Sequence, residues 1–307
     1  MNILLPMTVT DPHSFATCRC RSLTGIRSAY CKASVLQLLL PAALWLITVS
    51  VSAQDSIAMQ TYTFKKTADA DLQLDVFRPA HIQQPVPVIL LFHGGSWVSG
   101  NKSQLHWQCR YFAQQGILSI TANYRLLGKD TSRKDICIMD ARSAVRWVKE
   151  HAAELHADTN NIVLGGASAG GHIATMAVLN QSFNDPSDKN TAPVHARALV
   201  LFNPAYTLAG LPVQQPFRFD KTQLPPVIMF FGSRDKWKPA ADSMRIQMYN
   251  VHKDCETWIA AGETHGFFNK APWNLATCIK AQDFLNRKGL IKQPQQISSA
   301  LLIPEPD

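Results

Sequence analysis

The chain has 307 residues, of which 46% are hydrophobic and 17% charged, and this composition excludes an intrinsically disordered protein. Such a length can bury a large core without disulfides or metals, in one or two domains. Thirty Lys and Arg residues against 22 Asp and Glu give a formal net charge of +8, so the place of the cations decides whether an anionic partner is implied.

The first 53 residues have the pattern of a secretory signal. The run Val35–Val51 carries no charge, and the small residues Val51-Ser52-Ala53 that close it are of the kind a signal peptidase reads. The run is shorter than the ~20 apolar residues of a spanning helix, and Pro41 interrupts it. We therefore expect residues 1–53 to be removed on export to the periplasm or the extracellular space, with no stable membrane insertion afterwards. The charged residues of this segment are Arg19, Arg21, Arg27, Lys32 and Asp11.

Removing this leader leaves a chain whose Lys and Arg are scattered among acids. A nucleic-acid-binding face requires clustered cations, so a nucleic-acid partner is excluded. Four cysteines remain, and an even number in an exported protein permits two disulfides. Since Cys109 and Cys137 flank the same predicted strand in helix-forming stretches, we expect them to pair, which leaves Cys255 with Cys278. The alternative is four free, buried thiols.

Beyond the leader, strand-like and helix-like segments alternate. Segments 61–66 and 72–79 alternate polar and apolar residues, as half-exposed antiparallel strands do. Six continuous apolar runs are typical of strands covered on both faces: 86–92, 117–122, 161–164, 198–202, 227–231 and 257–260. A helical periodicity is clearest over 138–155. This order predicts an α/β fold over residues 54–290, with a mostly parallel central sheet and helices on both faces, followed by a loose tail over 291–307.

A glycine-rich turn follows the run 161–164. Ligands of such sheets bind at the carboxyl ends of the strands, so the residues after each run are candidates for chemistry. Gly166-Ala167-Ser168-Ala169-Gly170 fits the G-x-S-x-G pattern, in which glycines permit a tight strand-to-helix turn that presents a nucleophilic serine. A helix-like segment, 172–179, follows as the pattern requires. We therefore predict that Ser168 is a nucleophile rather than an incidental serine in a turn.

A nucleophilic serine needs a base and an acid that orients the base. His265 follows the run 257–260 and Asp235 follows the run 227–231, which gives the chain order Ser, Asp, His known from one class of catalytic triads. The other histidines are weaker candidates: His151 and His156 fall on a solvated helix surface, His172 is structural, and His93 belongs to another motif. Asp220, Asp242 and Glu263 are rival acids, of which Asp242 lies inside a helical pattern, so Asp235 is favoured.

The segment His93-Gly94-Gly95-Ser96-Trp97 follows the run 86–92. Attack on a carbonyl leaves an oxyanion that needs fixed N–H donors, and small residues let the backbone approach it. Ala169, directly after the nucleophile, supplies another N–H. Trp97 and Trp237 follow catalytic loops and could stack on a sugar or aryl group, or be packing residues at the rim. Asn123-Tyr124-Arg125 is interpreted as bracing a strand end.

From about residue 60 to residue 288 the chain resembles an α/β-hydrolase, in the esterase branch near hormone-sensitive lipases and the bacterial acetyl-xylan and feruloyl esterase-like proteins. The resemblance implies Ser168 as nucleophile, Asp235 as acid, His265 as base, oxyanion donors at the amides of Gly95, Ser96 and Ala169, and no cofactor or metal. Many relatives have a third glycine at the position of Ser96. The matching pieces are HGGSW (93–97), ANYRL (122–126), DARSAVRWVKEHAAEL (140–155), GGASAGGH (165–172), FGSRD (231–235) and HGFF (265–268).

The expected function is therefore that of a secreted serine carboxylesterase that hydrolyses short-acyl esters, acetyl above all, on a small molecule or a carbohydrate such as a plant polysaccharide. The short segment between residues 202 and 227 indicates an open site with little lid. A serine peptidase or amidase on the same fold is the alternative, although its prolyl-cleaving members resemble G-x-S-Y-G and carry a propeller domain for which this chain has no room. A non-catalytic binding module would have lost a triad residue, and none is lost.

Overall fold

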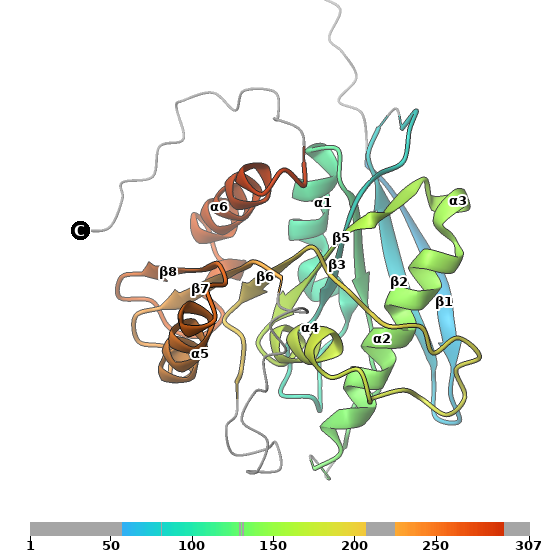
Figure 1. Ribbon diagram of the computed structural model, residues 1–307, viewed down its shortest axis with the longest axis horizontal. Helices are drawn as coiled ribbons and strands as arrows, with labels where there is room; N and C mark the ends of the chain where they lie inside the picture. The colour runs from blue at the N-terminus through green and yellow to red at the C-terminus, as the bar shows by residue number, and fades with distance from the viewer. Residues whose placement is uncertain (1–56, 81, 129, 131, 207–224, 292–307) are drawn as a thin grey trace, which may run out of the picture. The chain divides into compact units, whose positions relative to one another are not determined.

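The computed structural model describes residues 57–80, 82–128, 130, 132–206 and 225–291 (Figure 1). Within these ranges eight strands form one sheet in the order β1-β2-β4-β3-β5-β6-β7-β8. The predicted leader, the predicted tail beyond Ile291, the rival acid Asp220 and most of the segment predicted to form little lid, residues 207–224, lie outside the described residues.

The sheet is antiparallel at one edge and parallel elsewhere. β1 (Ala58–Lys66) pairs antiparallel with β2 (Asp71–Arg78), which pairs antiparallel with β4 (Leu118–Ala122). The other pairs are parallel and are formed by β3 (Val86–Phe92), β4, β5 (Ala157–Ala167), β6 (Ala198–Phe202), β7 (Val227–Gly232) and β8 (Cys255–Ala260). The predicted fold class is confirmed. β5 is longer than predicted because its polar first residues extend back to a pairing of Ala157 with Val86.

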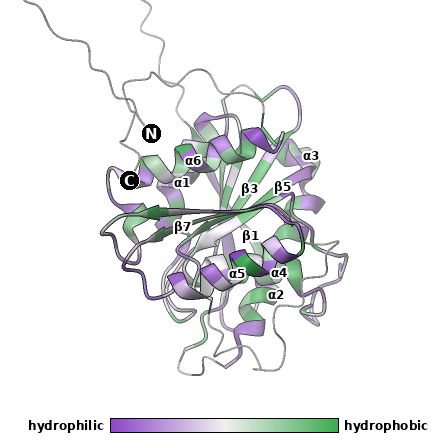
Figure 2. Ribbon diagram, turned by 60° about the vertical axis from the view of Figure 1, so that its left-hand side comes forward, coloured by the Kyte–Doolittle hydropathy of each residue, from purple (hydrophilic) through white to green (hydrophobic). Residues whose placement is uncertain are grey.

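Helices cover both faces of the sheet (Figure 2). α1 (His106–Gln114) and α6 (Trp273–Arg287) lie on one face. α2 (Lys134–Glu150), α4 (Ala169–Leu179) and α5 (Lys238–Asn250) lie on the other. The helical pattern over 138–155 is interrupted at His151, which caps α2 and precedes the short α3 (Ala152–Leu155). In the described part of the chain, no helix is long and apolar enough to span a membrane.

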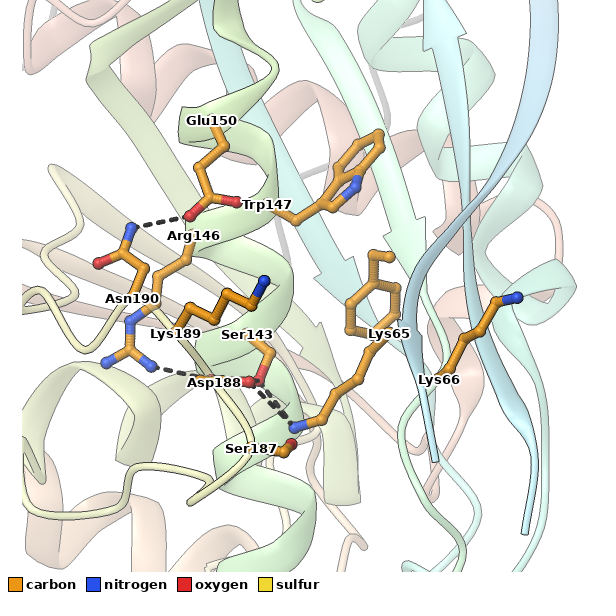
Figure 3. Close-up of a pocket in the computed structure, with 11 residues that line it drawn as sticks. Lys65, Lys66, Ser143, Arg146, Trp147, Glu150, Ser187, Asp188, Lys189 and Asn190 are labelled. Carbon is orange, nitrogen blue, oxygen red and sulfur yellow. Dashed lines mark hydrogen bonds and ion pairs between the residues drawn. The ribbon is translucent and has the colours of Figure 1, made fainter. Parts of the chain in front are cut away.

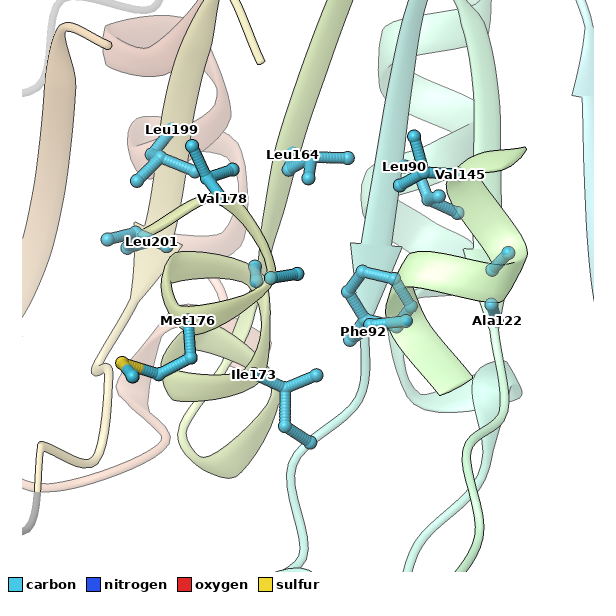
Figure 4. Packing of buried hydrophobic residues seen from close by; sticks show 14 of the residues in the cluster. Leu90, Phe92, Ala122, Val145, Leu164, Ile173, Met176, Val178, Leu199 and Leu201 are labelled. Carbon is cyan, nitrogen blue, oxygen red and sulfur yellow. The ribbon is translucent and has the colours of Figure 1, made fainter. Parts of the chain in front are cut away.

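Each face of the sheet buries its own core. Along β3, Leu90 and Phe92 pack toward α2 and α4, whereas Ile89 and Leu91 pack toward α1 and α6. Figure 4 shows the first of these cores, where Val145 of α2 and Ile173 of α4 meet the strands. Burying one such side chain contributes about 1.5–3 kcal/mol, so both faces stabilise the strands that carry the site. Two covered faces also explain why runs such as Ile89–Phe92 of β3 and Ala198–Phe202 of β6 are apolar at every position rather than alternating.

The two predicted disulfides are wrong. Cys109 and Cys137 belong to the cores on opposite faces of the sheet, and Cys255 and Cys278 are divided in the same way. The sheet therefore separates the sulfurs of each pair, whereas a disulfide needs Cα atoms within about 7 Å. All four cysteines in the part of the chain that the structure describes are free, and burial raises the pKa of the Cys137 thiol to about 12. The alternative of free thiols is thus the observed one.

Candidate active site

Ser168 stands at the junction of β5 and α4 in a strained backbone conformation. Its φ of 50° and ψ of −114° are uncommon for a residue with a side chain, and such a conformation costs on the order of 1–3 kcal/mol. The turn is also tightly packed: a Cβ on Gly166 would lie 2.5 Å from the carbonyl oxygen of Phe92, and one on Gly170 would lie 2.0 Å from the same oxygen. The glycines of the motif are thus required by close approach to β3.

The structure brings the three predicted triad residues together. His265 Nε2 lies 2.8 Å from Ser168 Oγ, and His265 Nδ1 lies 2.9 Å from Asp235 Oδ2. Since an ionised carboxylate only accepts hydrogen bonds, Nδ1 carries the ring proton and Nε2 is free to accept from the serine hydroxyl. Asp235 follows β7 and is 4% exposed, whereas His265 follows β8 and is exposed on the serine side. The base is therefore accessible and the acid is buried.

Three donors surround the Asp235 carboxylate. Burial alone would raise the pKa of Asp235, but hydrogen bonds from His265, from the Trp237 amide and from Asn203 outweigh it and hold that pKa below its ordinary value. The Trp237 amide donates to Oδ1 over 2.9 Å, and Asn203 Nδ2 donates to Oδ2. Asp235 is therefore ionised at neutral pH, the state in which it orients the imidazole.

The rival acids that the structure describes have other partners. Asp242 forms an ion pair with Lys238 at 2.8 Å inside α5. Glu263 accepts a hydrogen bond from the Trp273 indole at 2.9 Å. Neither carboxylate is bonded to His265, which leaves Asp235 as the acid in contact with the base.

Asn203 is a site residue that the sequence reasoning missed. It follows β6, is fully buried, and contacts both Asp235 and the backbone after His265, because its Oδ1 accepts from the Gly266 amide at 3.3 Å. The signal that could have found it is its position directly after a core strand, the same rule that selected the triad.

The loop that follows β3 presents backbone N–H groups as hydrogen-bond donors. Gly95, Ser96 and Trp97 have successive positive φ values of 125°, 53° and 65°. The Gly94 amide donates to Gln104 Oε1 at 2.6 Å and is occupied. In the part of the chain that the structure describes, the amides of Gly95 and Ser96 have no protein acceptor.

Ala169 completes the set of predicted donors. It is the first residue of α4, so its amide has no acceptor within the helix. An N–H group at a helix N-terminus also carries the positive end of the helix dipole. The three amides predicted as oxyanion donors therefore remain available beside Ser168.

Trp97 and Trp237, the two tryptophans predicted to follow catalytic loops, differ in how deeply they are buried. Trp97 is 5% exposed and packs edge-on against His172, with ring centroids 5.4 Å apart, so it lies in the core rather than at a surface for stacking. Trp237 is half-buried against the same core and serves the site through its backbone amide.

Burial, and then the charge of Lys134, lower the pKa of His172 to about 3, so this histidine is neutral and structural.

A cavity of about 340 Å³ lies between the end of β1, α2 and residues 187–190 (Figure 3). Lys65, one of its lining residues, also belongs to a buried charged cluster, in which its Nζ lies 2.8 Å from Asp185 and 3.2 Å from Asp140. Arg125 bonds to both of these carboxylates, at 2.5 and 2.7 Å. Since these cations and carboxylates satisfy one another, the cluster braces the segment after β4 against α2. The described residues contain no group of three or more His, Cys, Asp or Glu arranged to hold a metal ion.

Comparison with known proteins shows that the chain is similar to esterases. The BD-FAE family model matches residues 74–204, a range that includes Ser168 and ends before Asp235 and His265. Thermogutta terrifontis esterase 2 phosphorylated by paraoxon is similar, with 31% identity and a TM-score of 0.69 over 76% of this chain and 96% of that chain. The propionate-bound thermophilic esterase of the same organism has 30% identity and a TM-score of 0.69, over 77% and 96% of the two chains.

Curated relatives match over shorter stretches. The probable carboxylic ester hydrolase LipM of Mycobacterium tuberculosis is 34% identical over 116 residues, which are 37% of this chain and 26% of LipM. Carboxylesterase NlhH of the same species is 34% identical over 119 residues, 38% of this chain and 36% of NlhH. The matched part thus spans between about a quarter and a third of the length of these relatives.

Proposed function

The chain belongs to the α/β-hydrolase family of serine ester hydrolases, and from that premise we propose that it hydrolyses short-acyl carboxylic esters through a Ser168 acyl-enzyme. The observation that carries the proposal is the hydrogen-bonded series from Ser168 Oγ through His265 to the buried Asp235, built on a strained elbow. The 2.8 Å between Ser168 Oγ and His265 Nε2 is short enough for direct proton transfer from the hydroxyl to the imidazole, while the 2.9 Å contact of Nδ1 with Asp235 orients the ring.

Each step of the mechanism uses a group already in place. His265 Nε2 takes the proton of Ser168 while Oγ bonds to the ester carbonyl carbon, and the carbonyl oxygen becomes an oxyanion held by the amides of Gly95, Ser96 and Ala169. Collapse of this intermediate breaks the bond to the alcohol, which leaves with the proton from His265. Water then attacks the acyl-serine with His265 again as base, releasing the acid and restoring Ser168.

The proposed acyl group is short, with acetyl first. Support comes from the similar Thermogutta esterase 2, whose solved structures include propionate-bound and butyrate-bound forms. The proposed alcohol is a small molecule or a carbohydrate such as an acetylated plant polysaccharide, in line with the resemblance to acetyl-xylan and feruloyl esterase-like proteins. The proposed place of action is the periplasm or the extracellular space, which is supported by the signal-like residues 1–53.

The mechanism is tested with Ser168→Ala on p-nitrophenyl acetate. We expect hydrolysis to fall by a factor of at least ~10³, because the nucleophile is lost. Ser182→Ala, an exposed serine that follows α4, is the matched control and should keep the parent rate. Paraoxon should add a diethyl phosphoryl mass to the Ser168 peptide of the parent protein. Hydrolysis by Ser168→Ala at the parent rate would refute the mechanism.

The substrate class is tested separately. A series of p-nitrophenyl esters from acetyl to octanoyl should show the highest kcat/KM at the short end. Release of acetate from acetylated xylan would support a polysaccharide alcohol, and its absence alongside fast cleavage of small acetyl esters would limit the proposal to small molecules. Faster cleavage of prolyl amides than of acetyl esters would favour the peptidase or amidase alternative.

A further inference from the structure

Asn203 directly follows β6, at the edge of the sheet that carries the triad residues. β6 lies between β5, which carries the nucleophile, and β7, which carries the acid. At its end, the Phe202 carbonyl accepts the Ser168 amide at 2.9 Å, and the Asn203 amide donates to the Phe230 carbonyl at 2.8 Å. Asn203 has a left-handed φ of 46°, a conformation that asparagine tolerates better than most residues. Its side chain is therefore held between the two strands that carry the triad.

The side-chain amide of Asn203 makes two hydrogen bonds, one as a donor and one as an acceptor. Nδ2 donates to Asp235 Oδ2, and Oδ1 accepts from the Gly266 amide, directly after the catalytic histidine. One group thereby connects the acid to the loop that carries the base. An ionised aspartate could accept from Gly266 but could not donate to Asp235, and an aliphatic residue could do neither.

The contact with Asp235 bears on the base, because Oδ2 also accepts from His265 Nδ1. Asn203 Nδ2 and His265 Nδ1 thus donate to the same oxygen, so Asn203 helps to fix the position of the atom that orients the imidazole. The described charged groups nearby are engaged elsewhere: Arg234 with the Gly262 carbonyl, Lys238 with Asp242, Lys236 with the Trp237 ring, and Glu263 with Trp273. Asp235 is thus the charged group in direct contact with the base, and Asn203 donates a hydrogen bond to this group.

We propose that Asn203 is a positioning residue of the triad, which aligns Asp235 with the His265 loop and holds in place the Asp235 oxygen that orients His265. The proposal rests on the esterase function proposed above. Asn203 is fully buried, so it acts on the reaction through Asp235 and His265 rather than through contact with substrate.

The test is the pH dependence of kcat/KM for p-nitrophenyl acetate in Asn203→Asp. Aspartate keeps the shape, the tolerance of left-handed backbone and the acceptor for Gly266, but it adds a negative charge near His265. We expect the acid limb to move to higher pH by about one unit, and kcat near neutral pH to fall roughly tenfold with little change in KM. Asn161→Asp is the matched control, because Asn161 Nδ2 also donates to a carboxylate, Asp158 Oδ2 at 2.6 Å, but in the early part of β5. Its profile should match that of the parent.

Asn203→Ser provides a test without added charge. The serine hydroxyl is too short to bond Asp235 and Gly266 together, so we expect a lower kcat with KM within about twofold of the parent. A folded Asn203→Asp variant with the parent's acid limb would overturn the proposal, as would a parent-like kcat in Asn203→Ser if the aspartate variant does not fold. An inactive parent protein would instead contradict the esterase function itself, so the two failures are distinct.

Discussion

Gly94 lies directly against the nucleophile, since a Cβ on Gly94 would be 3.2 Å from the Cβ of Ser168. The same added atom would be 3.2 Å from Gln104 Oε1 and 3.3 Å from the Ala167 carbonyl oxygen, so the loop after β3 has no spare room at this point. The spacing between this loop and Ser168 is therefore fixed by the absence of a side chain.

Gly94→Ala should reduce catalysis without unfolding the protein. The new methyl group displaces the loop by a few tenths of an ångström and moves the Gly95 and Ser96 amides away from the developing oxyanion. We expect kcat for p-nitrophenyl acetate to fall by roughly tenfold or more, measured alongside circular dichroism. Val98→Ala, at an exposed position of the same loop, should stay within about twofold of the parent. An unchanged kcat in Gly94→Ala would show that this loop does not hold the oxyanion.

Ser96→Gly should stabilise the protein and preserve activity. Ser96 has a φ of 53°, which costs a residue with a side chain about 1–2 kcal/mol, whereas glycine adopts it freely. Part of the gain is offset by the greater entropy of glycine in the unfolded chain, so we expect the melting temperature to rise by roughly 1–3 °C. The amide at position 96 is retained, so kcat should hold. Ser99→Gly is the control, because Ser99 lacks a positive φ and its Oγ donates to the Gly95 carbonyl, so this variant should have a lower melting temperature. A similar fall in the melting temperature of both variants would contradict the strain argument.

Asp185→Asn should destabilise the fold in a pH-dependent way. Burial would raise the pKa of Asp185, but hydrogen bonds from Lys65, Ser187 and Arg125 outweigh it and hold the pKa well below its usual range. A carboxyl with a lowered folded-state pKa stabilises the fold above its unfolded pKa of about 3.9, and this contribution disappears as the pH falls through the folded value. We expect a loss of up to about 3 kcal/mol near pH 7, shrinking below pH 4, in urea unfolding.

The control for this prediction is Asp135→Asn. Asp135 pairs with Arg133, whose side chain is 59% exposed, and exposed ion pairs contribute little to stability because water screens them. Its removal should leave the stability nearly unchanged at every pH. Equal losses in Asp135→Asn and Asp185→Asn would mean that the cluster around Lys65 adds no more than a surface pair.

All four described cysteines should be alkylated in denatured protein that has not been reduced. Cys109 and Cys137 lie on opposite faces of the sheet, as do Cys255 and Cys278, so neither pair can close. Mass spectrometry after iodoacetamide treatment in guanidinium measures this, with a pre-reduced sample as the reference. A peptide linked through Cys109 and Cys278, which share one core, would be the informative contrary result.

The strands and the triad were predictable because both depend on short-range patterns. Runs such as 86–92 and 198–202 are apolar at every position since each strand is covered on both faces, and β3 and β6 have the predicted bounds. The failed predictions concern relationships across the sheet. Cys109 and Cys137 flank the same strand in sequence, but no pattern in the chain indicates the face on which each helix packs. The helical periodicity over 138–155 is interrupted at His151, because burial of its apolar neighbours does not require one unbroken helix.

By itself, the sequence predicted the fold class and the grouping of Ser168, Asp235 and His265, because glycine spacing at a turn and the order of strand ends are local properties of the chain. Tertiary structure alone decided that Asn203 contacts Asp235, that Trp97 is buried, and that the Lys65 cluster braces Arg125. These contacts join residues tens of positions apart, and side-chain direction and depth depend on how whole elements pack. The short motifs thus predicted the reactive groups, whereas the contacts that hold these groups in place follow from the packing between elements.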